Sequence, residues 1–450
     1  MSPLIPPGPK PLLPWTTLRR IRRDTLGFLT DMHRTYGDVA AWSIGRRRFH
    51  LVNHPDLNRE VLVVQAKKVR KGLGLQRGKI LLGEGLLTAE GETHLRHRRM
   101  MQPAFHHGKI AAYADLTVRH ALDLRSRVEG GQALDLNAAM TALTLAVAAE
   151  ALFGADVSEE SAVLGEALTT VIGSFNAVTN PLAGLLLRLP LPRTRRILGA
   201  IERLNQTIFR IIEARRRSGD EAPDLLSMLL HAQDDEDPDH RFSDRQVRDE
   251  AMTLFLAGHE TTANALTWTW HLLAGNPGAE ARLHGELDRV LEGRPPAFAD
   301  LPRLPYAEAV FAESLRLLPP VWGFGREVVE PLDLGPYRLE PGNLIVLSPW
   351  VLHRDPRWWP EPERFDPERH LGEAKAHRNK FTYFPFSHGP RNCIGEPFAW
   401  MEGVLILATL AQAWRFRPAP GRTVALDPLF TLRPRDGLWM VPEARLASLE

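Results

Sequence analysis

Residues 244–274 limit the possible folds of this chain more than any other segment. Ser243 and Gln246 form an S-x-x-Q capping box at the start of the segment, and Gly275 follows its end, so the spacing predicts one continuous helix. A helix of about 30 residues is about 45 Å long. The segment is apolar on nearly every face over most of its length. Because a helix that is apolar all round has to be buried, we expect it to cross the centre of a large core.

The other segments predict a mainly α protein with smaller β-sheets. Most of residues 91–217 has helical apolar spacing, for example residues 138–154. Residues 47–55 are typical of a strand, and residues 329–350 of short strands cut by Gly-Pro and Pro-Gly. We also expect a helix over residues 57–64, a helix after Cys393, an acidic loop at residues 234–239, an extended proline-rich leader over residues 1–14 and a single domain over residues 15–450.

Composition excludes several classes of site. Hydrophobic residues make up 44% of the 450 residues, so a large core is available. Cys393 is the only cysteine, so the chain cannot form an internal disulfide, a four-thiolate zinc site or most iron–sulfur sites. The apolar runs are shorter than the roughly 18 residues of a membrane helix, and the N-terminus has no signal-peptide pattern. We therefore expect a cytoplasmic protein without a membrane span.

Charge is distributed unevenly along the chain. The net charge is +2, but residues 1–110 carry 20 Lys and Arg against 8 Asp and Glu. This excess is either an ordinary solvated surface or a docking face for an acidic partner protein. Nucleic acid is disfavoured as a partner, because no binding motif interleaves aromatic and basic residues.

The sequence AGHETT interrupts the long apolar helix with small and polar residues. Ala257 and Gly258 remove side-chain bulk, while Glu260 and Thr261 place an acid beside an alcohol. One interpretation is structural, with the threonine bonded to the i−4 carbonyl and the glutamate satisfied by water. The other is a groove for a small ligand with a proton-delivery pair beside it. A zinc-protease motif is excluded, because Ala263 occupies the position of its second histidine.

Two further clusters pair charged residues at helical spacing. Glu313 and Arg316 lie three residues apart, and Arg369 could complete a buried Glu–Arg–Arg network with them. The alternative is a surface ion pair of about 0.2–0.5 kcal/mol. His94 and Arg98 lie four residues apart on one helix face and could clamp an anionic group, or they could belong to a solvated basic helix.

Cys393 lies between a Gly- and Pro-containing loop and the start of a predicted helix. The thiol could be a small buried hydrophobe, a nucleophile or a metal ligand. A core thiol does not need a glycine loop, a flanking arginine and a helix N-terminus, where the dipole favours a thiolate. A nucleophile would need a histidine base, and no triad pattern accompanies the nearby His388. A thiolate ligand to iron fits all of these features.

The loop FSHGPRNCIG, residues 386–395, resembles the haem-binding signature F-x-x-G-x-R-x-C-x-G of the cytochrome P-450 family. AGHETT resembles the family's oxygen-binding helix motif, ESLR with Arg369 resembles its Glu–Arg–Arg triad, and HLRHR resembles its haem-propionate clamp. The motifs follow the family's order, and its architecture would account for nearly the whole chain. The resemblance implies a cytochrome P-450 catalytic domain over residues 15–450, with haem buried between the long central helix and the helix after Cys393.

The resemblance also implies roles for individual residues. Cys393 is expected to be the axial ligand of the iron of haem b, and Glu260 and Thr261 to relay protons to bound dioxygen. One departure is that the segment after ESLR holds no arginine at an obvious fixed offset, and we match Arg326 to the family's propionate-binding arginine. Glu313, Arg316 and Arg369 are expected to form the structural triad. The expected haem-binding residues are His94, Arg98, Ala257, Gly258, Arg326, Phe386, Arg391 and Gly395.

The implied activity is a monooxygenase that inserts one atom of O2 into a C–H bond, by hydroxylation or epoxidation. No flavin or ferredoxin module follows Cys393, so we expect electrons to pass from NAD(P)H through an external ferredoxin or flavodoxin with its reductase. We expect the enzyme to be a monomer. Two alternatives remain open: a peroxide-using or isomerising haem-thiolate enzyme of the same fold, and a non-catalytic haem-thiolate sensor.

The substrate is expected to be a hydrophobic small molecule such as a terpene, a fatty acid or a polyketide. The positions where the family sets specificity are apolar in this chain, although simple core packing would also explain them. These positions hold Leu73, Leu75, Val321, Trp322, Phe324, Phe430 and Leu432.

Overall fold

The computed structural model describes residues 4–9, 14–154, 191–219, 224–234 and 236–445, together with residues 167, 170, 171 and 189. The chain divides into two compact units. The first consists of Met1–Gln76 with Ala312–Cys393, and the second of Arg77–Phe311 with Ile394–Glu450. Each unit therefore combines segments that are distant in sequence.

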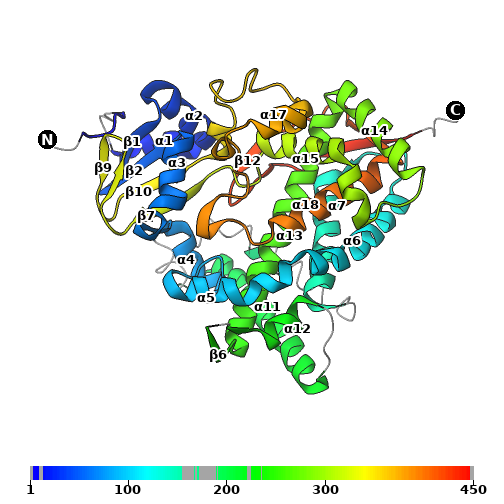
Figure 1. The fold of residues 1–450 in the computed structure, drawn as a ribbon, viewed down its shortest axis with the longest axis horizontal. Helices are drawn as coiled ribbons and strands as arrows, with labels where there is room; N and C mark the ends of the chain where they lie inside the picture. The colour runs from blue at the N-terminus through cyan, green and yellow to red at the C-terminus, as the bar shows by residue number, and fades with distance from the viewer. Residues whose placement is uncertain are drawn as a thin grey trace. The chain divides into compact units, whose positions relative to one another are not determined.

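A five-stranded mixed sheet forms the framework of the first unit (Figure 1). Its strands, in spatial order, are β1 (Val39–Ile44), β2 (Arg47–Val52), β10 (Leu344–Leu347), β7 (Phe324–Val328) and β3 (Val69–Lys71). Only the β2–β10 pair is parallel. Leu51 and Val52 are neighbours on β2 but belong to different hydrophobic clusters, because successive side chains of a strand point to opposite faces. A separate hairpin consists of β8 (Leu332–Leu334) and β9 (Tyr337–Leu339).

Short helices accompany this sheet. They are α1 (Pro14–Arg23), α2 (Thr25–Tyr36), α3 (Pro55–Arg59), α16 (Pro349–Leu352) and α17 (Gly372–Ala376), while α4 (Leu73–Leu82) and α15 (Pro305–Leu317) have residues in both units. The strand predicted at residues 47–55 is confirmed as β2. The helix predicted at residues 57–64 is confirmed as α3 followed by a π-helical turn, η1 (Glu60–Val64).

The described part of the expected leader, residues 4–9, contains no helix and contacts other segments of the first unit. Leu4 forms a β-bridge with Tyr337, and the Ala41 N–H donates a hydrogen bond to the Pro7 carbonyl at 2.7 Å. Residues 1–3 and 10–13 lie outside the described residues. The helix α1 begins at Pro14, where the leader was expected to end.

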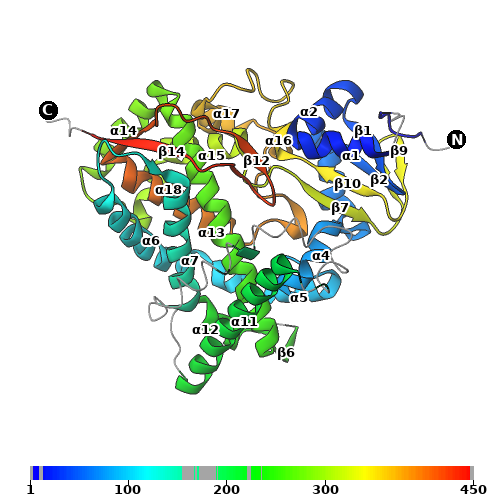
Figure 2. The ribbon, with the colours of Figure 1, turned by 180° about the vertical axis from the view of Figure 1, so that it is seen from behind.

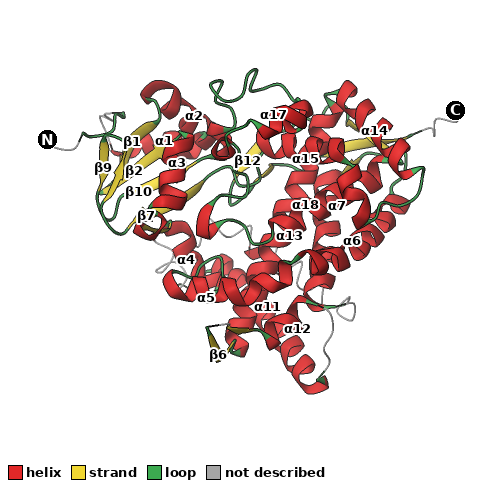
Figure 3. Ribbon diagram, in the orientation of Figure 1, coloured by secondary structure: helices red, strands yellow, loops and turns green. Residues whose placement is uncertain are grey.

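Helices dominate the second unit (Figure 3). The predicted long helix is confirmed as α13 (Asp244–Ala274), which has 31 residues and a reciprocal capping box between Ser243 and Gln246. It packs along α7 (Leu136–Phe153), and α18 (Glu396–Ala411) packs against α6 (His107–Arg127). The other helices are α5 (Gly91–Met101), α11 (Pro192–Ser218), α12 (Leu225–His231) and α14 (Pro277–Leu291).

The second unit also contains short strands (Figure 2). A three-stranded sheet has the order β11 (Trp414–Pro418), β14 (Trp439–Ala444) and β4 (Leu134–Asp135), and two hairpins consist of β12 (Leu426–Pro428) with β13 (Leu432–Pro434) and of β5 (Gln233–Asp234) with β6 (Asp237–Arg241).

The prediction of an acidic loop at residues 234–239 was wrong, because β5 and β6 pair there as an antiparallel hairpin. Arg96 and Arg99 contact the buried Asp234 carboxylate at 3.3 and 3.0 Å. These contacts compensate the negative charge of Asp234. A solvated loop was expected because burying this charge without a partner would be costly.

One helix of the described residues, Leu136–Phe153, is long and apolar enough by composition to cross a membrane. The same test is passed by core helices, and 56% of this helix is buried inside the protein. Its close packing along α13 accounts for its apolar surface.

Candidate active site

The loop that carries Cys393 is held in one conformation by its backbone. The Cys393 N–H donates to the Phe386 carbonyl at 2.9 Å, and the Asn392 N–H donates to the Gly389 carbonyl at 3.0 Å. Gly389 has φ +74°, and a Cβ there would lie 2.0 Å from the Leu62 carbonyl oxygen, so only glycine fits this close approach. The loop therefore presents its thiol from a fixed backbone.

Cys393 is exposed, in contrast to a cysteine that packs as a small hydrophobe. It lies three residues before the first residue of α18, and Gly395 is the N-cap of that helix. The positive end of the helix dipole favours an anionic sulfur at this place. An exposed thiol on a rigid loop before a helix suits a thiolate ligand to iron.

The helix α13 is open along one stripe. Between Asp249 and Trp270 every residue is buried except Leu254, Ala257, Gly258 and Thr261, which are half-buried. Their spacing places them on one helical face. Two of the four carry no side chain larger than a methyl group, so a ligand can approach the backbone closely at this stripe.

Glu260 and Thr261 have well-defined partners. The Thr261 hydroxyl donates to the Ala257 carbonyl at 2.7 Å, which is the local bond that the structural interpretation of this motif expects. Glu260 is buried and accepts a hydrogen bond from the Thr431 hydroxyl at 2.7 Å. Among the described residues, its Oε2 has no hydrogen-bond partner. Burial raises the pKa of the Glu260 carboxyl, and the bond from Thr431 offsets part of this effect.

Three consecutive carbonyls of α13 each accept a hydroxyl hydrogen bond at this point. In addition to the bond to Ala257, the Thr262 hydroxyl donates to Gly258 at 3.2 Å, and Thr144 on α7 donates to His259 at 2.9 Å. Hydroxyl groups that bond helix carbonyls in this way often bend a helix. The two threonines of AGHETT are therefore tied to the backbone of the helix that carries them.

Thr431 was missed in the sequence, although its neighbours Phe430 and Leu432 were singled out. The hydroxyl of Thr431 also accepts a hydrogen bond from the Asn264 amide at 3.1 Å. A lone polar residue between two apolar positions that were expected to contact the substrate is the signal that could have identified it.

The residues expected to bind haem propionates lie in both units. In the second unit, His94 is buried and Arg98 half-buried on α5. In the first unit, Arg391 is half-buried, as is Phe386. Arg326 is buried, donates to the Gly325 carbonyl at 3.1 Å and lies 4.9 Å from the centre of the Phe324 ring.

These observations agree with the requirements of haem. A soft thiolate suits its iron, cationic side chains suit its two propionates, and a helix stripe with little side-chain bulk suits a small ligand on the iron. The residues expected to hold the group are Cys393, Arg326 and Arg391 in the first unit, and His94 and Arg98 in the second.

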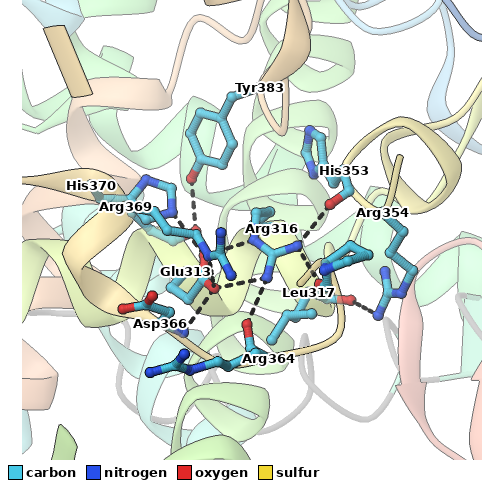
Figure 4. A network of polar contacts seen from close by, with 12 residues as sticks. Glu313, Arg316, Leu317, His353, Arg354, Arg364, Asp366, Arg369, His370 and Tyr383 are labelled. Atoms are coloured by element: carbon cyan, nitrogen blue, oxygen red, sulfur yellow. Dashed lines mark hydrogen bonds and ion pairs between the residues drawn. The ribbon is translucent and has the colours of Figure 1, made fainter. Parts of the chain in front are cut away.

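Glu313, Arg316 and Arg369 are brought together in the first unit (Figure 4). Arg316 donates to both carboxylate oxygens of Glu313 at 2.7 and 2.8 Å, and the Arg369 Nε lies 3.5 Å from Glu313 Oε1. Arg316 also donates to the carbonyls of His353, Pro362 and Arg364. The buried pair thus ties α15 to the segment that leads to the Cys393 loop.

His370 is a further member of this network that the sequence did not identify as such. Its Nε2 lies 2.9 Å from Glu313 Oε2, and Arg378 donates to its Nδ1 at 3.1 Å. Because Arg378 can only donate, Nδ1 accepts and the Nε2–H donates to Glu313. Burial lowers the pKa of His370, which agrees with a neutral ring in this tautomer.

The apolar residues expected to contact the substrate are half-buried, with one exception. Leu432 is completely buried, and its carbonyl accepts a hydrogen bond from the Trp268 indole at 2.9 Å. The half-buried residues are Leu73, Leu75, Val321, Trp322, Phe324 and Phe430.

Comparison with known proteins identifies the family. Residues 6–439 match the family model for cytochrome P450. The chain is 42% identical over 444 residues to "Cyclooctatin synthase" of Streptomyces melanosporofaciens, covering 98% of this chain and 95% of that protein. It is 40% identical to "Cyclooctat-9-en-7-ol 5-monooxygenase" of the same organism, with 93% and 90% covered. It is 33% identical to "Pentalenene oxygenase" of Streptomyces avermitilis, with 94% of each chain covered. These matches and the Cys393 loop agree, and the chain belongs to the cytochrome P450 family of monooxygenases.

Proposed function

We propose that this enzyme oxidises an unactivated C–H bond of a cyclic terpene, inserting one oxygen atom from dioxygen. The names of similar proteins support the substrate class, because they refer to cyclooctatin, cyclooctat-9-en-7-ol and pentalenene. The apolar residues at the expected specificity positions support a hydrocarbon skeleton. The observation that carries the reaction type is the pairing of a buried acid, Glu260, with the alcohol Thr261 beside the open stripe of α13.

Haem b is the prosthetic group that this proposal requires. Held by the thiolate of Cys393, it supplies the activation of dioxygen and the transfer of oxygen to carbon. His94, Arg98, Arg326 and Arg391 would neutralise the two propionates, whose burial without cations would be costly. The fixed backbone of the Cys393 loop orients the sulfur.

Thr261 and Glu260 would hold and move the protons that the reaction consumes. The Thr261 hydroxyl retains lone pairs that can accept one hydrogen bond while it donates another. Burial raises the pKa of Glu260, so this carboxyl holds a proton at a higher pH than an exposed glutamate. Its Oε2, which has no partner among the described residues, is the atom that can pass a proton towards Thr261.

Electrons are supplied by an external ferredoxin or flavodoxin and its reductase, ultimately from NAD(P)H. The basic excess of residues 1–110 supports an acidic partner. Arg96 and Arg99 contribute less to it than the sequence suggests, because both contact Asp234. A monomer in the cytoplasm agrees with dependence on a diffusing electron carrier.

The test uses the full chain loaded with haem. A reduced sample exposed to carbon monoxide is expected to show the Soret band of a thiolate-held haem. Turnover with pentalenene or cyclooctat-9-en-7-ol, a ferredoxin, its reductase and NADPH is expected to give a product that contains one atom from labelled O2. Haem binding without substrate-dependent NADPH consumption would indicate a sensor. Product formed only with hydrogen peroxide would indicate a peroxide-using enzyme.

A further inference from the structure

Two adjacent carboxylates near the start of α13, those of Asp249 and Glu250, bind a loop that has no role in the proposed reaction. Glu250 Oε2 accepts a hydrogen bond from the Leu86 N–H at 2.9 Å. Asp249 Oδ2 accepts one from the Glu84 N–H at 2.8 Å. Both side chains are buried, where a hydrogen bond to a backbone donor is expensive to lose. The loop of residues 83–89 is thus attached to α13 through its backbone.

Two glycines allow this close approach. A Cβ on Gly83, which has φ +69°, would lie 2.1 Å from Asp249 Oδ1. A Cβ on Gly85 would lie 2.3 Å from the Thr253 hydroxyl and 2.5 Å from the Asp249 carbonyl oxygen. Any larger residue would separate the loop from the helix.

His97 joins the same carboxylate from a second element. Its Nδ1 lies 2.6 Å from Glu250 Oε1, and the two side chains are 2% and 0% exposed. His97 lies on α5 between His94 and Arg98, the residues expected to bind propionates. Glu250 therefore connects α13, α5 and the loop of residues 83–89.

Glu250 lies on the same face of α13 as the open stripe. Ala257 and Thr261 follow it by seven and eleven residues, so each lies within about 20° of Glu250 around the helix axis, on opposite sides of it. Thr261 lies about 16 Å further along the axis. The loop bound to Glu250 consequently lies on the helix face that, nearer the C-terminus of α13, is open.

We propose that Glu250 and His97 are positioning residues that set the size of the ligand admitted to the open stripe of α13. They do so by holding the loop of residues 83–89 and α5 against the helix. The inference rests on the proposed function, because the stripe is the place where the substrate of a monooxygenase would react.

The test compares substitutions of Glu250 and His97 with a substitution in a similar buried pair of charged residues elsewhere. Glu250→Ala removes both contacts, Glu250→Gln keeps one acceptor oxygen, His97→Ala removes one contact, and His97→Gln keeps an N–H donor of similar reach. The control is Glu280→Gln, because Glu280 is a buried acid on α14 that accepts from Arg417 on β11 at 2.7 Å. Glu250→Gln and His97→Ala keep the proposal testable if Glu250→Ala does not fold.

The first measurement is hydrogen exchange of individual amides, which does not depend on turnover. Glu250→Ala is expected to raise the exchange rate of the Leu86 amide by about tenfold or more, since this amide loses its bond to a buried carboxyl. Glu280→Gln is expected to leave this rate unchanged. An unchanged Leu86 rate in a folded Glu250→Ala protein would overturn the proposal.

The second measurement is a pair of optical titrations of the ferric holoenzyme with imidazole and with 4-phenylimidazole. Glu250→Ala and His97→Ala are expected to weaken the binding of 4-phenylimidazole about fivefold or more. The binding of imidazole should weaken less than about twofold. His97→Gln is expected to resemble the unchanged protein, which a loss of packing alone would not explain. If the ratio of the two affinities stays within about twofold in every variant, the pair has only a structural role and the proposal fails.

The two proposals fail in different ways. If the unchanged protein shows no azole-induced spectral shift, it lacks an accessible haem iron, and the proposed function is overturned together with this inference. If the unchanged protein responds and the ratio does not change in the variants, only the positioning role is lost.

Discussion

Glu260 on α13 and Thr431 are 171 positions apart in sequence, yet the Thr431 hydroxyl donates to the Glu260 carboxylate at 2.7 Å. The C-terminal turn thus reaches the acid that the proposed reaction uses. Because the bond favours the ionised carboxylate, it lowers a pKa that burial raises.

Thr431→Val is expected to raise the pKa of Glu260, because it removes this bond and leaves the burial unchanged. The limb of the pH–rate profile that reports ionisation of Glu260 should then move to higher pH. The measurement is the pH dependence of product formed per NADPH consumed. Thr409→Val, at a buried threonine of α18 that bonds Leu405, serves as the control. If the limb lies at the same pH in Thr431→Val and in Thr409→Val, Glu260 does not belong to the proton path.

Thr261→Ala removes the hydroxyl next to Glu260 and leaves the helix backbone intact. We expect the yield of product per NADPH to fall roughly tenfold, with the missing electrons recovered as hydrogen peroxide, because proton delivery by a positioned group is lost. Thr261→Ser retains the hydroxyl and should retain most of the yield. An undiminished yield in the alanine variant would refute the assigned role.

Glu402 makes the stability of the second unit depend on pH. It is completely buried on α18, and burial raises its pKa from 4.5 to about 8. Thr262 lies close enough to lower this pKa slightly, but its hydroxyl donates to Gly258, and neither carboxyl oxygen accepts a hydrogen bond of normal geometry among the described residues.

The sign of the effect follows from the two states. Between pH 4.5 and about 8 the unfolded chain releases the proton of Glu402 and the folded chain keeps it, so the free energy of unfolding falls as pH rises. Glu402→Gln cannot ionise and should lose this dependence. Relative to the unchanged protein, its free energy of unfolding should rise by about 3–4 kcal/mol on going from about pH 5 to about pH 8. Urea denaturation of the two haem-loaded proteins at both pH values measures it. Parallel pH curves would contradict a neutral Glu402.

His370→Phe tests the extended network around Glu313. The substitution removes one donor to a buried carboxylate and the acceptor of Arg378, so we expect a loss of about 1–3 kcal/mol in the free energy of unfolding. His370→Gln, which can donate to Glu313, should recover part of it. His377→Phe, at the exposed histidine that is the C-cap of α17, should have little effect. Equal stability of both phenylalanine variants would show that His370 contributes nothing to the network.

Salt is expected to slow electron delivery if an acidic carrier binds the basic surface of residues 1–110. Exposed charges are screened over about 10 Å at 0.1 M salt, so the second-order rate of reduction by ferredoxin should fall as sodium chloride is added. Stopped-flow absorbance of the haem measures this rate. A rate independent of salt would argue for an uncharged docking surface.

Much of this architecture could be predicted because its signals are local. The capping box at Ser243 and the apolar run that follows define α13 within a few residues. The loop before Cys393 needs a glycine at one position, and the observed contact of Gly389 with Leu62 explains why. Periodicity and backbone geometry are properties of short segments, so one sequence is sufficient to reveal them.

Other features depend on contacts between distant segments and could not be predicted in this way. The bond from Thr431 to Glu260 joins two segments whose spacing carries no pattern. The hairpin at residues 233–241 forms where the acidic composition favoured a loop, because arginines of α5 compensate Asp234. His370 was passed over because only the folded chain places it beside Glu313 and Arg378.

The three hydroxyl groups bonded to the carbonyls of Ala257, Gly258 and His259 have a mechanical consequence. If the helix widens here, each of these oxygens keeps a donor even when its own backbone partner moves away. Local unwinding would therefore leave no bare acceptor in a dry interior.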